Sequence, residues 1–293
     1  MKQRTVNEYL QDRYGKKLYK IAINAGLTCP NRDGTLGSRG CIFCSGTGSG
    51  DFAEDPCLSV SEQIERGKRR VRNKLPKKDF GYIAYFQAYT NTYGPMERLE
   101  ELYTEAAMHK DIELISIATR PDCLQDDVLD LILRINRIKP VWIELGLQTI
   151  HERTAEYMRR GYTLDVYDEA VKKLRDRGIE TIVHVILGLP GESRQDMLDT
   201  VKYVGDSGVQ GIKLQLLHVL RGTDLADDYL SGKFTCLGME EYIDLIQKAL
   251  AILPEDMVIH RMTGDGDKKL LIAPEWSKDK KRVLNLLNKA LSG

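Results

Sequence analysis

The 293-residue sequence lacks a net charge, a long apolar run and a recognisable leader segment. Its 43 Lys and Arg residues balance 43 Asp and Glu residues, which excludes a strongly basic binder of the histone type. No apolar run approaches the ~18 residues that a membrane-spanning helix needs, and the polar residues 1–17 contain no export signal. We therefore expect a cytoplasmic protein without a membrane partner.

Cysteine is also scarce, and its distribution is uneven. Six cysteines in 293 residues are too few for the disulfide framework of a small secreted domain. Three of them, Cys29, Cys41 and Cys44, nevertheless lie within sixteen positions. This crowding favours thiolate ligation of a metal centre in the cytosol. Hydrophobic residues make up 42% of the chain, which is enough to bury a core.

Short β-rich runs alternate with helical patterns as far as about residue 225. Ser59 precedes Glu62 by three positions and Ser193 precedes Asp196 by three, and this spacing predicts helix-capping boxes. Strands that alternate with helices indicate βαβ units and a parallel sheet. We predict a barrel over 1–225 and a C-terminal extension, 226–293, packed on it. The predicted strands are 17–23, 80–86, 112–118, 140–147, 180–187 and 210–217.

Two of the predicted strands carry polar residues on one face. Glu144 and Gln148 alternate with apolar residues, as do Lys213 and Gln215. Parallel strands covered on both faces normally form continuous apolar runs, so the pattern predicts a solvated or ligand-filled interior. The expected fold is α/β, a partial (β/α)6 barrel of the TIM type with a C-terminal α/β cap. Because an unpaired buried charge costs several kcal/mol, Glu144 and Lys213 either contact ligands or pair with each other or with neighbouring strands.

The cysteine-rich loop can hold a metal centre. Cys41-Ile-Phe-Cys44 is a CxxC turn, and glycines at 34, 37 and 40 allow the segment between Cys29 and Cys41 to fold back. Three thiolates on a four-iron cluster leave one iron open, whereas a structural zinc site needs four ligands, and Cys57 could supply the fourth. Two interpretations remain at this point. One is an iron–sulfur enzyme, and the other is a zinc-stabilised nucleic-acid-binding barrel without radical chemistry.

Further motifs follow or end the predicted strands, in the same order as the strands. Together with Cys29 and the aromatic residue before Cys44, they resemble the radical S-adenosylmethionine (SAM) superfamily, in the branch related to the elongator catalytic subunit. The spacer of eleven residues between Cys29 and Cys41 resembles that of the bacterial MnmL-like proteins. The acetyltransferase-like domain of elongator subunits is absent, so acetyl transfer is not implied. The motifs are FQAYTNTYGP (86–95), ATRPDC (118–123), IELGLQT (143–149), HVILGLPGE (184–192) and GIKLQLLH (211–218).

The resemblance implies two cofactors, a [4Fe-4S] cluster on Cys29, Cys41 and Cys44, and SAM. One electron from a low-potential donor such as flavodoxin or ferredoxin would cleave SAM to a 5′-deoxyadenosyl radical. The implied substrate is tRNA, modified at the 5-position of the wobble uridine, as in a step from 5-carboxymethylaminomethyl to aminomethyl. A small-molecule or peptide substrate stays open.

The resemblance also suggests residues for cofactor and substrate. Phe43 would pack near the adenine of SAM. Glu144 and Gln148 would reach the ribose or the amino acid of SAM. The turn at Gly188 would let adenine approach the backbone, unless it is only a connection between a strand and a helix. Lys213 and His218 would contact substrate. The predicted acceptors for the methionine amine are Gln87, Thr90 and Asn91.

A basic run is the candidate tRNA contact. Residues 66–78 hold eight Lys or Arg residues and no acid. Arg69, Arg70 and Arg72 would bind phosphates and release counterions, unless the run is only a solvated helix face.

Overall fold

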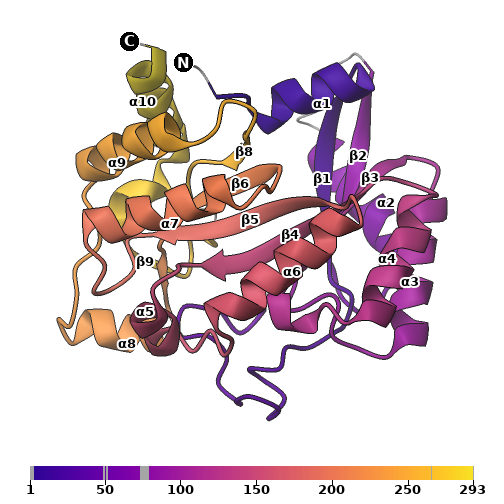
Figure 1. Cartoon of the computed structure of the whole chain (residues 1–293), viewed down its shortest axis with the longest axis horizontal. Helices are drawn as coiled ribbons and strands as arrows, with labels where there is room; N and C mark the ends of the chain where they lie inside the picture. The colour runs from indigo at the N-terminus through magenta and orange to yellow at the C-terminus, as the bar shows by residue number, and fades with distance from the viewer. Residues whose placement is uncertain (1–2, 49, 51, 73–78, 265, 293) are drawn as a thin grey trace.

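Seven parallel strands form the central sheet, in the order β1-β2-β3-β4-β5-β6-β8 (Figure 1). The computed structural model describes residues 3–48, 50, 52–72, 79–264 and 266–292. The sheet curls into a half-barrel, so the prediction of an α/β partial barrel is confirmed. The strands are β1 (Lys17–Ile23), β2 (Phe80–Phe86), β3 (Ile112–Thr119), β4 (Val141–Gln148), β5 (Glu180–Leu187), β6 (Gly211–Leu216) and β8 (Val258–Arg261).

The six strands predicted before residue 225 agree with β1 to β6 to within one residue at each end. The seventh, β8, comes from the predicted extension, yet it pairs with β6 in parallel and lengthens the sheet. The extension also contributes β9 (Leu271–Ala273), which forms a separate antiparallel pair with β7 (Val219–Leu220). The residues after 225 therefore contribute both to the barrel wall and to its cover.

Helices pack on the outer face of the sheet, where the main hydrophobic core lies (Figure 1). Ser59 and Ser193 cap α2 and α7 with the capping boxes that their spacing predicts. No helix in the described residues is long and apolar enough to cross a membrane. The longer helices are α2 (Val60–Val71), α3 (Met96–Met108), α4 (Asp126–Asn136), α6 (Leu164–Asp176), α7 (Arg194–Asp206), α9 (Met239–Ile252) and α10 (Lys280–Ser292). Shorter elements are α5 (Glu152–Tyr157), α8 (Asp224–Leu230), η2 (Pro121–Cys123) and η3 (Glu275–Lys278).

Helix α1 (Val6–Tyr14) closes the end of the half-barrel at which the strands begin (Figure 1). Its Leu10 packs with apolar side chains of five strands, and this cluster fills the end of the half-barrel at which the strands begin. The strand residues are Leu18, Ile83, Leu114, Trp142 and Ile182. The next side chains along the strands that point inward are polar, and we call them the charged layer. Its members are Lys20, Tyr85, Ser116, Glu144, His184 and Lys213. In the described residues, the apolar cluster and the charged layer thus fill the lower part of the half-barrel, and the carboxyl ends of the strands stay open to ligands.

Candidate active site

A cavity of about 260 Å³ opens where the parallel strands end. Barrel enzymes build their active sites at this end, because the loops after the strands converge there. The lining includes all three clustered cysteines, although they come from a loop remote in sequence from most of the other lining residues. Seven further predicted residues share the lining: Phe43, Gln87, Thr90, Glu144, Gln148, Lys213 and His218.

Main-chain hydrogen bonds shape the cysteine loop. The amides of Arg32 and Asp33 donate to the carbonyl of Cys29, at 2.8 and 3.2 Å, and turn the spacer back on itself. The amide of Cys44 donates to the carbonyl of Cys41 at 3.0 Å and closes the CxxC turn. Burial, with a smaller contribution from Cys44, raises the pKa of the Cys41 thiol to about 11. A metal would have to displace that proton and stabilise the thiolate.

The arrangement does not match a single zinc ion. Zn–S bonds of about 2.3 Å hold tetrahedral sulfurs about 3.8 Å apart. In the described residues, one group of three or more metal-ligating atoms lies within 4.8 Å of one another, and it contains no cysteine. Cys57, the predicted fourth zinc ligand, is exposed and does not line the cavity.

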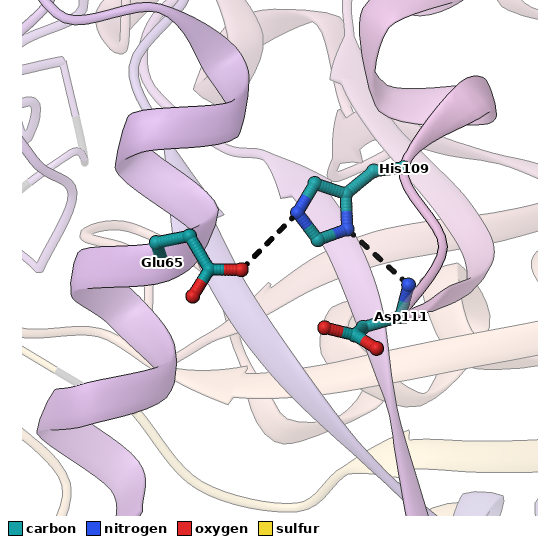
Figure 2. A group of neighbouring side chains, drawn as sticks. All are labelled: Glu65, His109 and Asp111. Carbon is teal, nitrogen blue, oxygen red and sulfur yellow. Dashed lines mark hydrogen bonds and ion pairs between the residues drawn. The ribbon is translucent and has the colours of Figure 1, made fainter.

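That compact group consists of Glu65, His109 and Asp111 (Figure 2). His109 lies between the other two, with Nε2 3.3 Å from Glu65 and Nδ1 accepting from the main-chain amide of Asp111 (Figure 2). The ammonium of Lys68 contacts both carboxylates. The group therefore already has a cation of its own, and it lies just before β3, at the opposite end of the sheet from the cavity.

Backbone strain is concentrated around the cavity. In the described chain, the non-glycine residues with positive φ are Tyr89, Gln148 and Arg159, at 60°, 71° and 58°. Tyr89 and Gln148 line the cavity, and the carbonyl of Arg159 lies 3.6 Å from the Cys41 sulfur. Left-handed backbone in residues with a Cβ costs free energy, so strain gathered at one place indicates a functional site.

Gln148 ends β4 beside a register shift between β4 and β5. This irregularity accompanies the left-handed backbone and re-aims the side chain. The Oε1 atom of Gln148 is buried and accepts no hydrogen bond from the described residues. A buried amide oxygen without a donor costs about 1–3 kcal/mol. Gln148 is therefore suited to accept a hydrogen bond from a ligand in the cavity.

Glu144 is the centre of the charged layer and is only 1% exposed. Lys20 and Ser116 donate to its Oε1, with Ser116 at 2.7 Å. His184 donates to Oε2 at 2.8 Å, and Lys213 also donates to Oε2. The structure thus pairs Glu144 with Lys213, one of the two arrangements that the sequence left open.

Two lysines share this one carboxylate, and the pKa values follow from that imbalance. Burial alone would raise the pKa of Glu144, but the charges of Lys20 and Lys213 lower it well below its usual range. Burial lowers the pKa of Lys213 well below its usual range. The negative charge of Glu144 acts in the opposite direction, but the positive charge of Lys20 offsets it. Burial and the Lys213 charge lower the pKa of His184 to about 4. His184 is therefore neutral at pH 7 and donates through Nε2–H.

The remaining predicted cofactor and substrate residues have different positions. Asn91 is fully buried and donates to the carbonyls of Phe86 and Ala118, and it does not line the cavity. Gly188 has a φ of 92° but also lies outside the lining. His218 lines the cavity beneath Gly264, where a Cβ would come within 2.5 Å of its ring.

The predicted tRNA contacts lie away from the cavity. Arg69, Arg70 and Arg72 are exposed at the end of α2, and Arg70 pairs with Glu54 at 2.6 Å. Helix α2 starts near Asn24, just after β1, and runs away from the carboxyl ends of the strands, whereas the Arg70 side chain reaches the carbonyl of Phe52 at 2.6 Å. None of the three arginines lines the cavity. The rest of the basic run, 73–78, falls outside the described residues.

Four polar residues around the cysteines were not predicted from the sequence. Arg120, 8% exposed, forms a bidentate pair with Asp122 at 2.9 and 2.7 Å. Arg160 donates to the carbonyl of Thr149 at 2.6 Å. Arg120 could have been found, because it lies just after the third predicted strand. The other residues, Asn31, Arg32 and Arg160, lie in loops whose path no local pattern determines.

This fold and this cysteine-lined cavity define a class of enzyme, the radical SAM enzymes. The chain belongs to the Radical SAM superfamily, whose sequence model matches residues 31–204, and the Radical SAM C-terminal domain matches residues 209–292. The predicted family and its two cofactors, a [4Fe-4S] cluster and SAM, are thereby confirmed. Radical SAM enzymes also need a reductant.

Individual proteins of known sequence or structure are similar to most of this chain. The chain is 46% identical to YtqA of Bacillus subtilis over 287 residues, which span 98% of this chain and 88% of YtqA. It is 25% identical to the tRNA uridine(34) acetyltransferase of Methanocaldococcus jannaschii, over 84% of this chain but 51% of that protein. The structure of Methanocaldococcus infernus Elp3 shares the fold with a TM-score of 0.69 at 19% identity, covering 94% of this chain and 63% of the other.

The residues around the cavity fit both cofactors. Three thiols suit a cluster that leaves one iron open, and the buried Oε1 of Gln148 can accept from a polar group of SAM. Phe43 lines the same cavity and offers an apolar surface beside the CxxC turn.

Proposed function

We propose that this radical SAM enzyme modifies a uridine of tRNA, at the 5-position of the wobble base. The similarity to a tRNA uridine(34) acetyltransferase over 84% of the chain carries the proposal. The step would convert a 5-carboxymethylaminomethyl group to aminomethyl. The carboxymethyl carbons would leave with the oxygen of water as glyoxylate, and SAM would take up the two electrons on its conversion to methionine and 5′-deoxyadenosine. No acetyltransferase domain is required. The position of the cavity supports the proposal, because a base flipped out of its stack could approach from the open side at the carboxyl ends of the strands.

The charge of the cavity also supports an anionic guest. Among the described lining residues, five are Lys or Arg and one, Glu144, is an acid. In this proposal Lys213, in β6, faces an anionic group of the substrate. His218, which follows β6, also contacts the substrate. Arg120 and Arg160 already pair with Asp122 and Glu152, which lie outside the lining, and Lys213 pairs with Glu144. The lining charges that favour a carboxylate are those of Arg32 and Arg261.

The cofactor roles follow from the lining. Cys29, Cys41 and Cys44 would hold the cluster, and Phe43 and Gln148 would contact SAM together with Gln87 and Thr90. When bound, the cluster and SAM supply a radical that abstracts a hydrogen atom from the substrate. A low-potential protein such as flavodoxin or ferredoxin would deliver the electron.

Nucleoside mass spectrometry of tRNA from a deletion strain tests the function. We expect one modified wobble uridine to disappear and its precursor to accumulate. The gene for the wild-type protein should restore the modification, and the Cys41→Ala variant should not. An unchanged profile of tRNA nucleosides in the deletion strain would contradict a tRNA substrate and would favour a small molecule or a peptide.

A further inference from the structure

The eleven-residue spacer between Cys29 and Cys41 contains an asparagine whose amide meets a cysteine sulfur. Asn31 is 5% exposed, and its Nδ2 lies 3.3 Å from the Cys41 sulfur and 2.6 Å from the carbonyl oxygen of Arg159. An amide nitrogen carries two protons. One can serve the carbonyl and the other the sulfur.

The surroundings fix the orientation of this amide. Nδ2 also lies 3.4 Å from the carbonyl oxygen of Arg160, and two carbonyl oxygens would repel an amide oxygen in the same place. The opposite atom, Oδ1, packs on Gly161, where a Cβ would approach it to 2.9 Å. The carbonyl of Asn31 accepts from the amide of Gly40 at 2.7 Å. The contacts of Nδ2, of Oδ1 and of the main-chain carbonyl of Asn31 together hold the Nδ2 donor toward the Cys41 sulfur.

We infer that Asn31 is a positioning residue that tunes the cluster: its amide hydrogen bond to the Cys41 sulfur raises the reduction potential of the cluster. A reduced cluster carries one more negative charge than an oxidised one, so a donor to a ligating sulfur stabilises the reduced state more. The hydrogen bond changes no covalent bond, and the electron still comes from the external low-potential donor. The inference depends on the family's cluster and not on the substrate.

Asn31→Ala tests this by titration of the cluster potential with optical or EPR detection. The potential should become more negative than that of the wild-type protein, while the iron content stays the same. Thr35→Val is the matched control, because Thr35 anchors the same spacer to the Tyr93 hydroxyl at 2.9 Å and contacts no cysteine sulfur in the described residues. An unchanged potential in Asn31→Ala with full iron would overturn the inference, and so would an equal change in Thr35→Val.

A second measurement needs no variant and tests the hydrogen bond on which the inference depends, even if Asn31→Ala loses its iron. Wild-type protein labelled with ¹⁵N in the side-chain amide of asparagine is reduced and studied by pulsed EPR. We expect a ¹⁵N coupling to the cluster, because Nδ2 donates to a ligating sulfur. Absence of that coupling would refute the hydrogen bond.

Discussion

At the scale of single residues, the site consists of groups that are stable only together. Glu144 needs Lys20 and Lys213, and both lysines need Glu144, because each is buried or partly buried. Gln148 keeps a strained backbone and a buried amide oxygen without a donor in the described residues. Such costs persist where function requires them.

Iron content distinguishes the cysteines. Cys29→Ala, Cys41→Ala and Cys44→Ala should each remove most of the roughly four irons per chain expected of anaerobic protein, because each would lose one ligand. Cys57→Ala is the control and should keep them, since Cys57 is exposed outside the cavity. Stoichiometric zinc that depends on Cys57 would contradict the assignment.

Gln148 should show a trade-off between stability and activity. Gln148→Gly relieves the left-handed backbone and should raise the free energy of unfolding by about 1 kcal/mol. Gln148→Ala keeps the strain, and the lost burial of the side chain offsets the removal of the unpaired amide oxygen, so the thermal midpoint should stay nearly unchanged. Both should lower SAM cleavage about tenfold, the equivalent of one hydrogen bond, with unchanged iron. Normal cleavage in both variants would exclude a cofactor role for the amide.

The charged layer predicts a pH dependence of stability. His184 has its folded pKa lowered to about 4, from 6.5 in the unfolded chain. Between these values the unfolded state binds the extra proton, so the stability that His184 contributes is complete above pH 6.5 and is lost as pH decreases toward 4, by on the order of 3 kcal/mol. Urea unfolding of the cofactor-free protein measures this. His184→Gln should flatten the slope, and His260, whose pKa burial also lowers, should keep a remainder.

At the scale of elements, short segments position the site. Helix α8 contacts the cysteine loop, where the amide of Leu225 donates to the carbonyl of Ile42 at 2.9 Å and Asp224 pairs with Arg39. At the other end, α1 seals the barrel through Leu10, which is 2% exposed. The two helices act on opposite ends of the same strands.

Leu10→Ala should destabilise the fold without disturbing the cofactor site. A large-to-small change in a sealed core costs about 3 kcal/mol through lost burial and the cavity left behind. Chemical denaturation measures the loss, and iron content should stay at the wild-type level. Asn7→Ala, at an exposed position of the same helix, should change stability little. Equal stability of the two variants would mean that α1 does not seal the core.

At the scale of the whole molecule, the described part of the basic run, Arg66 to Arg72 at the end of α2, lies away from the cavity. A strand of seven residues spans about 23 Å, so a ligand that touches both must extend along the flank of the barrel. A folded tRNA can do this, whereas a small molecule cannot. The surface and the cavity can therefore be tested separately.

The triple variant Arg69→Glu, Arg70→Glu, Arg72→Glu should weaken tRNA binding at low salt. The slope of log affinity against log salt should flatten by about one unit for each phosphate that the protein no longer neutralises. SAM cleavage without tRNA should be unchanged, because these residues do not line the cavity. Unaltered tRNA affinity would refute this docking surface and leave the cavity chemistry in place.

Local sequence patterns were sufficient to predict the strands, the capped helices and the cysteine loop. Each depends on a pattern within one segment: short β-rich runs between helical patterns indicated β1 to β6, and Ser59 with Glu62 indicated the start of α2. The local pattern also predicted Gln148 as a site residue, because a polar residue at the end of an apolar strand can be recognised within one segment.

Which side chains meet became known from the three-dimensional arrangement alone. Lys20, Glu144 and Lys213 come from three strands far apart in sequence, and the curl of the sheet places them in one buried layer. The amide of Asn31 reaches Cys41 and Arg159 only because the spacer folds back. Contacts between distant segments depend on sheet curvature and loop path, which arise from packing of the whole chain and leave no periodic signal in any one segment.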